Sequence, residues 1–481
     1  MAILSCRNII KTYNRGNTVA LDNVSFEVEE GEIFGLVGPD GSGKSTLFRI
    51  MTTLLTADKG EAIMCDMDIV KSYKEIRKII GYMPGKFSLY QDMTVEENLE
   101  FFATTFGTTI KENYHLIEGI YKQIEPFKNR RSGKLSGGMK QKLALSCALI
   151  HAPKLLFLDE PTTGVDPVSR KEFWEMLHRL NKEYGITIIV STPYRDEVMQ
   201  CGRIALMNEG KITSIGSPQE VMPEEVGLSH NIHYFDDKPI VIEANRLTKK
   251  FGSFVATDQI TFNVFEGEVF GFLGANGAGK TTAMRMLCGL SQPSDGWAKV
   301  AGFDIAKEHE KVKKNIGYMS QKFSLYDDLT VKDNLILFGG LYGMSKGDIK
   351  QKSEKLLKEL GMEERKNDLV SSLPLGWKQK LAFSVSIFHE PKIVFLDEPT
   401  GGVDVETRKQ FWQLIYDAAN RGITVFVTTH YMDEAEYCDR VSIMVDGHIK
   451  ALDTPDNLKK QFEVDNMYDV FLKLARSAKR T

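Results

Sequence analysis

The sequence predicts an α/β protein that consists of two similar domains in tandem, each built around a mainly parallel sheet. Its 481 residues are too many for one ordinary hydrophobic core. The segment GEIFGLVGPDGSGKST, which starts at Gly31, recurs as GEVFGFLGANGAGKTT from Gly267. In the first copy, short apolar runs at 33–37, 155–158 and 186–190 alternate with longer helical patterns, such as the helix predicted at 44–55, as in parallel strands joined by helices. The repeat therefore indicates a duplicated domain rather than a solenoid of short units.

Two further repeated segments define the extent of each domain. IGYMPGKFSLYQDMTVEENL returns as IGYMSQKFSLYDDLTVKDNL, and LLFLDEPTTGVDP returns as IVFLDEPTGGVDV. The repeated segments follow one another in the same order in both copies. We therefore expect a first domain at 1–226, a short polar linker at 227–237 and a second domain at 238–481.

The composition argues against several functional classes. A formal net charge of -4 and a pI near 6.2 do not suit a nucleic-acid-binding surface, so we expect no nucleic acid partner. The six cysteines include no CxxC pair, which argues against a zinc site or a disulfide framework. The N-terminal residues are polar where a signal peptide is apolar, and no apolar run approaches the roughly 18 residues of a membrane span. We expect a cytoplasmic protein that is peripheral to the plasma membrane and reaches it through a partner.

Both copies carry the phosphate-binding pattern GxxxxGK[ST] directly after a predicted strand. The glycines let backbone N–H groups wrap around phosphate oxygens, and the N-terminus of the following helix adds positive charge. The lysine neutralises the β- and γ-phosphates, and the next hydroxyl suits Mg²⁺. We expect contacts to ATP from Gly38, Pro39, Asp40, Gly41, Ser42, Gly43, Lys44, Ser45 and Thr46 in the first copy, and from Gly274, Ala275, Asn276, Gly277, Ala278, Gly279, Lys280, Thr281 and Thr282 in the second.

Each LDE segment places two acidic residues at the end of an apolar strand. The aspartates, Asp159 and Asp397, are in the position that holds the Mg²⁺ shell in phosphate-loop ATPases. The glutamates that follow, Glu160 and Glu398, are placed to orient or deprotonate the attacking water. The Mg²⁺ ligands predicted from both motifs are Ser45, Asp159, Thr281 and Asp397.

The segment LSGGMKQ at 135–141 resembles the signature of ABC ATPases. Together with the two phosphate loops, it makes the whole chain similar to an ABC ATPase subunit with two nucleotide-binding domains. The GYM-x-x-KFSLY-x-D segments resemble the Q-loop region of ATPases that drive ABC-2-type exporters, in particular the YbhF-like tandem subunits. The resemblance implies two P-loop NTPase domains of the RecA-like α/β fold, each with a small helical insert, at about 86–134 and 322–372.

The resemblance also implies how the ATP sites assemble and which residues form them. In this family two cassettes pack head to tail, so that each ATP lies between the phosphate loop of one and the signature of the other. A Q-loop glutamine contacts Mg²⁺ and the attacking water, a switch histidine bonds the γ-phosphate, and an aromatic residue stacks on adenine. The residues at these positions are Ser136, Gly137 and Gly138 in the signature, Gln321 in the Q-loop, His430 as the switch, and Tyr13 and Phe251 at the adenine.

Each copy departs from this family pattern. The first copy has Gly85 where the second has Gln321, and Pro193 where the second has His430. Glycine has no side-chain amide, and proline offers neither a side-chain donor nor a backbone N–H. The second copy reads LPLGW at 373–377 in place of the signature, so a proline replaces the serine and a leucine replaces the first glycine.

Head-to-tail pairing would place all of these departures on one site. That site combines the first phosphate loop with the second signature, although it keeps Glu160. The other site combines Lys280, Glu398 and His430 with the complete signature of the first copy. We therefore predict that hydrolysis occurs mainly at the second phosphate loop; independent loss in both copies is the alternative reading.

The leading functional prediction is the ATPase subunit of an exporter. The cofactors would be ATP and Mg²⁺, and the partners would be integral-membrane ABC-2-type permease subunits, two in number, with a membrane-fusion protein as a further partner. Drug-like compounds are the substrates that the resemblance suggests. Two alternatives also lack membrane spans: the tandem ATPase of a sugar importer, and a ribosome-associated tandem ABC protein. The latter class usually has a long charged linker and basic surfaces, which this sequence lacks.

Overall fold

The computed structural model describes residues 2–13, 18–39, 41–85, 88–163, 165, 167–222, 238–321 and 325–477. These residues form two compact units, one for each copy of the repeat. The predicted linker at 227–237 lies outside the described residues, so the domain boundaries stay predictions. Within the described residues, none of the helices has the length and apolar character needed to span a membrane.

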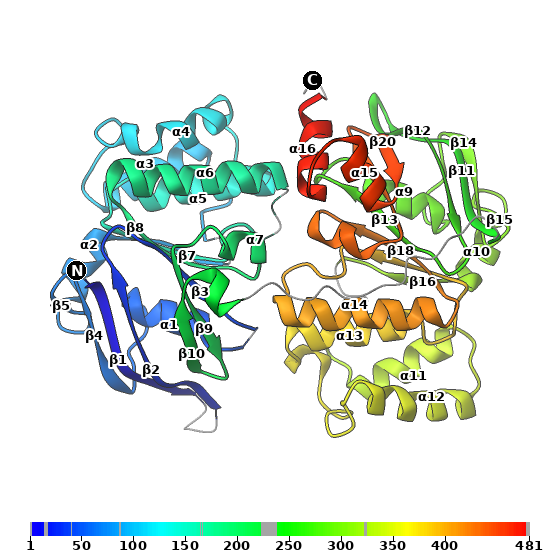
Figure 1. The fold of residues 1–481 in the computed structure, drawn as a ribbon, viewed down its shortest axis with the longest axis horizontal. Coiled ribbons are helices and arrows are strands. Elements are labelled where there is room, and N and C mark those ends of the chain that lie inside the picture. The colour runs from blue at the N-terminus through cyan, green and yellow to red at the C-terminus, as the bar shows by residue number, and fades with distance from the viewer. Residues whose placement is uncertain are drawn as a thin grey trace. The chain divides into compact units, whose positions relative to one another are not determined.

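The first domain contains a six-stranded sheet in which all neighbouring strands are parallel except one edge pair (Figure 1). Its three central strands are buried along their whole length, because packing on both faces leaves no side for water. From one edge to the other, the strands are β10 (Lys211–Gly216), β9 (Arg203–Asn208), β3 (Ile33–Val37), β8 (Thr187–Ser191), β7 (Leu155–Asp159) and β6 (Ile80–Met83).

A second, antiparallel sheet of four strands covers part of the first domain, and the sequence analysis did not predict it. Over part of their length, its long strands do not alternate between buried and exposed residues. Their pairing also contains several register shifts. The period of two that marks a strand in sequence is absent from β1 and appears in β2 only over its second half, from Val24 to Glu29. In spatial order the strands are β2 (Thr18–Glu29), β1 (Ala2–Tyr13), β4 (Lys59–Met64) and β5 (Met67–Asp68).

Two hydrophobic clusters hold the first domain together, one on each face of the parallel sheet. Neighbouring residues of β3 alternate between them: Ile33 and Val37 belong to one cluster, and Phe34 and Leu36 to the other. The first cluster includes α5 (Gly137–Leu149), α6 (Pro167–Tyr184) and the helical insert, and the second includes α1 (Lys44–Met51) and the antiparallel sheet. The helices are α1 (Lys44–Met51), α2 (Tyr73–Ile79), α3 (Val95–Thr105), α4 (Tyr114–Ile124), η2 (Glu125–Phe127), η3 (Ser132–Lys134), α5 (Gly137–Leu149), α6 (Pro167–Tyr184), α7 (Arg195–Val198) and α8 (Pro218–Val221).

Helix α1 is shorter than the pattern of apolar residues from 44 to 55 predicts. It ends at Met51, and Thr53 adopts a left-handed backbone with φ 61°. The guanidinium of Arg77 donates hydrogen bonds to the hydroxyl and the carbonyl of Thr53, both at 2.8 Å. A left-handed residue stops a helix, so the leucines that follow lie in a turn.

The second domain repeats this architecture. Its parallel sheet runs β16 (Ile316–Met319), β17 (Ile393–Asp397), β18 (Thr424–Thr429), β13 (Val269–Gly274), β19 (Arg440–Val445) and β20 (His448–Asp453). Its antiparallel sheet runs β12 (Phe254–Phe265), β11 (Ile240–Phe251), β14 (Asp295–Val300) and β15 (Phe303–Asp304). The helices are α9 (Lys280–Leu287), α10 (His309–Asn315), α11 (Val331–Leu341), α12 (Lys346–Glu359), η4 (Val370–Ser372), α13 (Leu375–Ser386), α14 (Val405–Asn420), η5 (Asp433–Tyr437), α15 (Pro455–Gln461) and α16 (Met467–Ser477).

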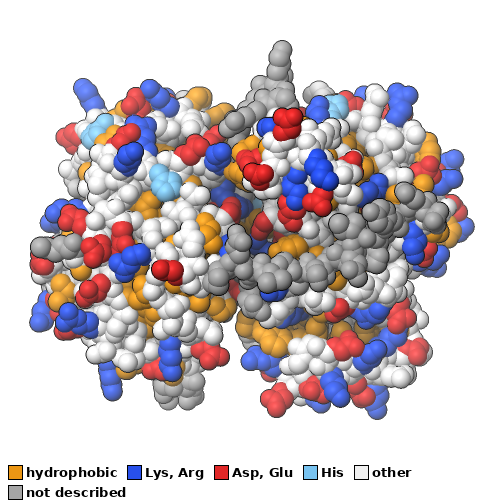
Figure 2. Space-filling model, in the orientation of Figure 1, with side chains coloured by type: hydrophobic (Ala, Val, Ile, Leu, Met, Phe, Trp, Pro, Cys, Tyr) orange, Lys and Arg blue, Asp and Glu red, His pale blue; other side chains and the backbone are white. Residues whose placement is uncertain are grey.

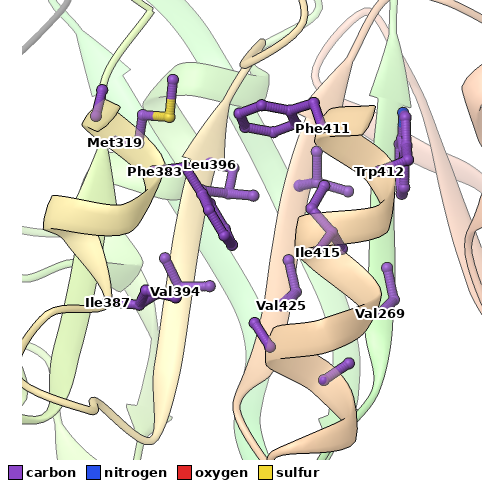
Figure 3. Close-up of a cluster of buried hydrophobic side chains, with 14 of the residues drawn as sticks. Val269, Met319, Phe383, Ile387, Val394, Leu396, Phe411, Trp412, Ile415 and Val425 are labelled. Carbon is purple, nitrogen blue, oxygen red and sulfur yellow. The ribbon is translucent and has the colours of Figure 1, made fainter. Parts of the chain in front are cut away.

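The core of the second domain lies where α14 and α13 pack on its parallel sheet (Figure 3). Phe411 and Trp412 of α14 are fully buried there, beside Leu396 and Val425 of the central strands. Truncating either aromatic side chain to alanine typically costs about 3–5 kcal/mol of stability. This core fixes the carboxyl ends of β17 and β18, where the predicted site residues lie.

Candidate functional site

The two phosphate loops have nearly the same backbone. Each follows a buried strand, β3 or β13, and leads into α1 or α9. The φ angles are 155°, 81° and 103° at the glycines of the first loop, and 158°, 83° and 102° at those of the second. A Cβ on Gly43 would lie 2.4 Å from the carbonyl oxygen of Ala20, and one on Gly279 would lie 2.2 Å from that of Ala256. Both positions therefore require glycine for conformation and for space.

The loop lysines are buried and directed over their own loops. Nζ of Lys44 donates to the carbonyl oxygens of Gly38 at 2.6 Å and Pro39 at 2.9 Å. In the second copy, Nζ of Lys280 donates to the matching carbonyls at 2.7 and 3.1 Å. Each ammonium thus lies beside backbone amides and a helix N-terminus, an arrangement suited to phosphate. Asp40, predicted to contact ATP, lies outside the described residues.

The aspartate at the end of β17 is close to the hydroxyl of the second phosphate loop. Oδ1 of Asp397 accepts hydrogen bonds from Thr281 at 3.3 Å and from Thr428 at 2.7 Å. Burial raises the pKa of Asp397, and the Thr428 hydrogen bond partly opposes that rise. In the first copy, Asp159 accepts from the hydroxyl of Ser191 at 2.6 Å.

These oxygen donors fit Mg²⁺. Mg²⁺ prefers hard oxygen ligands, and in nucleotide sites it uses one or two carboxylates together with phosphate oxygens and water. Thr281 and Asp397 supply a hydroxyl and a carboxylate side by side. Among the described residues, no group of three or more His, Cys, Asp and Glu side chains could hold a metal ion.

Glu398 is the centre of a charged and hydrogen-bonded group in the second copy. Gln321 Nε2 donates to its Oε2 at 2.8 Å, and His430 Nδ1 lies 3.1 Å from the same oxygen. Lys280 Nζ lies 3.5 Å from Oε1. Burial alone would raise the pKa of Glu398, but His430 and Lys280 outweigh it and lower that pKa to about 2. The structure thus brings together four residues predicted from separate motifs.

The matching glutamate of the first copy has different surroundings. Glu160 accepts a hydrogen bond from Thr163 at 3.4 Å. A Cβ built on Gly85 would lie 3.9 Å from the carboxyl carbon of Asp159, so this position also borders the acidic strand end. Gly85 has no side-chain amide that could donate a hydrogen bond, as Gln321 does in the second copy. Pro193 is buried at the position of His430.

The backbones around the two glutamates nevertheless match. Glu160 and Glu398 both adopt left-handed conformations, with φ of 50° and 48°. Such angles are strained for a non-glycine residue and cluster at functional sites. The turns at the switch position also agree, because the amide of Tyr194 donates to Thr192 Oγ1 at 3.1 Å and that of Tyr431 donates to Thr429 Oγ1 at 3.0 Å. The copies therefore differ in side chains and not in scaffold.

The two signature segments also share a backbone. Ser136 caps α5, with its Oγ accepting from the amide of Met139 at 3.4 Å and φ of -64°. Pro374 occupies the same capping position of α13, with φ of -56°. Proline adopts this φ readily, so α13 forms without the serine. What the second copy loses is the hydroxyl and the exposed backbone of glycine.

The predicted adenine-stacking residues end the matching strands β1 and β11. Phe251 is 56% exposed, and Nζ of Lys249 lies 5.3 Å from its ring centre. Tyr13 is half-buried. An exposed ring at this place can receive a base, and the roles of Tyr13 and Phe251 at the adenine stay predictions.

Sequence reasoning missed two kinds of polar residue near the sites. One is the hydroxyl of Ser191 or Thr428, which orients the strand-end aspartate. The other is a buried glutamate, Glu197 or Glu434, that lies a few residues beyond the switch position. Both pairs match between the copies, and comparing the repeats position by position could have found them.

The fold and the two loops define a P-loop nucleoside triphosphatase with two nucleotide-binding domains. A sequence profile of the ABC transporter family matches residues 21–163 and 257–401. The chain therefore belongs to the ABC transporter family, and its activity is ATP hydrolysis.

Three comparisons illustrate what the chain resembles. It is 38% identical to "Probable multidrug ABC transporter ATP-binding protein YbhF" of Escherichia coli (strain K12), over 97% of this chain and 96% of that protein. It is 28% identical to "Ribose import ATP-binding protein RbsA" of Lactococcus lactis, over 93% and 96%. A solved structure titled "RNase-L Inhibitor" matches with a TM-score of 0.69 at 21% identity, over 95% of this chain and 92% of that one, which shows the shared tandem fold alone.

Proposed function

We propose that this protein is the ATPase subunit of a multidrug exporter and that it hydrolyses ATP mainly at the second phosphate loop. The observation that carries the proposal is the group around Glu398, where Gln321, His430 and Lys280 lie within 3.5 Å of one carboxylate. The first copy has Gly85 and Pro193 at the positions of Gln321 and His430. The relative with 38% identity bears a multidrug name, whereas the sugar-import relative is 28% identical.

The contacts of Glu398 suggest how ATP activates this site. Lys280 and His430 hold the pKa of Glu398 near 2, at which a carboxylate is a poor base. A triphosphate in the loop offers the Lys280 ammonium a stronger anionic partner. Transfer of this ammonium to the phosphates raises the pKa of Glu398 towards that of an ordinary carboxylate, so the residue accepts a proton from water more readily. Thr281 and Asp397 would hold Mg²⁺, which neutralises charge on the phosphates.

The signature that completes the hydrolytic site is Ser136, Gly137 and Gly138 of the first copy in this proposal. Their exposed backbone at the start of α5 provides amides and a helix N-terminus for the γ-phosphate. Pro374 removes one amide at the other signature, and Leu375 adds bulk. The first phosphate loop then binds nucleotide and turns it over slowly.

Replacing His430 by alanine tests the proposed switch. We expect the kcat for ATP hydrolysis to fall about 100-fold, because one preorganised donor to the γ-phosphate is lost. The KM should change little, since the phosphate loop is untouched. Steady-state ATPase assays on the purified permease complex measure both constants, and a His430→Ala variant that works at the wild-type rate contradicts the assignment.

Membrane permease subunits of the ABC-2 type, two per complex, are the proposed partners. Tyr90 and Tyr326 follow the matching Q-loops and are 50% and 55% exposed. Each rests on a phenylalanine of the insert, Phe101 at 4.9 Å or Phe338 at 6.2 Å between ring centres. Exposed aromatic rings on a packed support suit a docking surface for a helix. On the face that Figure 2 shows, charged side chains of both signs are interspersed.

Co-purification from detergent-solubilised membranes tests the exporter assignment. We expect a tagged chain to retain integral-membrane permease subunits, and Tyr90→Ala with Tyr326→Ala to weaken that association. Recovery of ribosomal subunits, or of a sugar-import permease, overturns the proposal in favour of the corresponding alternative.

A further inference from the structure

Glu434, in η5, is a fully buried carboxylate that connects two turns of the hydrolytic domain. Its exposed fraction is 0%. Its Oε2 accepts a hydrogen bond from the hydroxyl of Thr429 at 2.6 Å, and its Oε1 accepts one from the hydroxyl of Thr400. Thr429 directly precedes His430, and Thr400 lies two residues beyond Glu398. One carboxylate therefore links the turn of the switch histidine to the turn of the glutamate.

The residue after His430 is fixed by the same group. The amide of Tyr431 donates to Thr429 Oγ1 at 3.0 Å, and the guanidinium carbon of Arg408 lies 4.8 Å from the tyrosine ring centre. Nε of Arg408 lies 3.7 Å from Oε1 of Glu434. Both chain neighbours of His430 are thus held by Glu434, directly or through its ion pair.

The partners of Glu434 act against the effect of burial on its pKa. Burial raises the pKa of Glu434, and Arg408 is the largest influence that opposes this rise. A buried carboxylate in this state needs its cation and its hydroxyl donors together, since loss of one partner leaves an uncompensated group. The connection is therefore rigid, and a change at Glu434 transmits to both turns.

The first domain contains the same arrangement around Glu197. Its Oε2 accepts from Thr192 at 2.6 Å, its Oε1 accepts from Thr162, and Nε of Arg170 lies 3.5 Å away. There the turn carries Pro193, which has no donor to position. The first domain hence supplies a matched control in which a glutamate with the same burial and the same types of hydroxyl and guanidinium partner serves a turn without a histidine.

We propose that Glu434 is a positioning residue for ATP hydrolysis, which holds His430 at its distance from Glu398. This inference rests on the proposed function of the second phosphate loop. It assigns Glu434 an effect on the rate of the chemical step and none on nucleotide binding.

The test compares Glu434→Gln with Glu197→Gln in the permease complex. Glutamine keeps the size of the glutamate side chain. It presents an NH₂ group to one of the two threonine hydroxyls and replaces the carboxyl group opposite Arg408 or Arg170 by an amide. We expect Glu434→Gln to lower kcat at least about tenfold and to leave the KM for ATP within twofold of the wild-type value. Residues that hold a metal ligand or a catalytic side chain in its orientation have effects of this size. Glu197→Gln should change kcat less than about threefold, although both variants should lose similar thermal stability. Equal loss of kcat in the two variants overturns the proposal.

A double-mutant cycle with His430→Ala supplies a readout that a purely structural role would not move. If Glu434 acts through His430, adding Glu434→Gln to His430→Ala should change kcat less than twofold, whereas independent effects multiply. If Glu434→Gln fails to fold, Thr429→Val removes only the contact next to His430, with Thr192→Val as its control. Wild-type kcat in Thr429→Val refutes the inference. Measuring Glu398→Gln in parallel separates the two failures, because full activity there contradicts the proposed function itself.

Discussion

Glu398→Gln should lower the steady-state rate of ATP hydrolysis about 1,000-fold, within the range that a general base contributes. The amide is isosteric with the carboxylate and keeps the left-handed turn, so the loss reports chemistry rather than folding. Nucleotide binding should survive, because Lys280 and the loop glycines are unchanged. ATPase assays on the purified complex, with binding of a fluorescent ATP analogue as the folding control, measure the two quantities separately.

Glu160→Gln is the matched control for this prediction. It changes the same type of residue at the same strained φ in the first copy. We expect this variant to keep at least about half of the wild-type rate, because the first copy has neither the glutamine side chain nor the histidine that Glu398 has beside it. Comparable losses from the two substitutions would mean that both copies hydrolyse ATP, and the asymmetric assignment would then be wrong.

Exchanging the two signatures should have an effect of similar size. Ser136→Pro combined with Gly137→Leu gives the first copy the residues of the second, and we expect kcat to fall about 1,000-fold, as loss of more than one preorganised donor predicts. The φ of -64° at Ser136 already suits proline, so α5 should still form. ATPase assays check the rate, and circular dichroism checks that helix content is retained.

The reverse exchange shows on which phosphate loop each signature acts. Pro374→Ser combined with Leu375→Gly repairs the second signature, and we expect the steady rate to change less than about twofold, since the first phosphate loop still lacks a Q-loop glutamine and a switch histidine. Activity that survives the damage to the first signature would rule out the composite site.

The sequence predicted the parts of this molecule that depend on local residue pattern. The phosphate loops, the buried strands of the parallel sheets and the strand-end acids all follow from short motifs, because glycine, lysine and apolar runs have direct backbone consequences. The antiparallel sheets were missed, since β1 and β2 pair through several register shifts. The end of α1 was missed because the left-handed turn at Thr53 is fixed by Arg77, which lies far along the chain.

Some residues of the candidate sites could likewise be predicted from the sequence, and others could not. The roles of Gln321 and His430 came from resemblance to a family, and the fold then placed both beside Glu398. Glu434 and Thr428 belong to no local motif, because a buried polar residue looks like any surface residue until its partners are known. Only their match between the two repeats points to them. Their contacts join segments about 30 residues apart, which no local pattern encodes.

The proposed confinement of hydrolysis to the second phosphate loop would have an energetic consequence for transport. A transporter that hydrolyses one ATP per cycle has half the free energy available per cycle of one that hydrolyses two. For the same cargo moved per cycle, the steepest concentration ratio that it can sustain is the square root of the ratio available to a symmetric machine. The absence of a side-chain amide at Gly85 and of an imidazole at Pro193 would therefore lower the amount of ATP consumed per cycle. It would also lower the largest concentration ratio that transport can sustain.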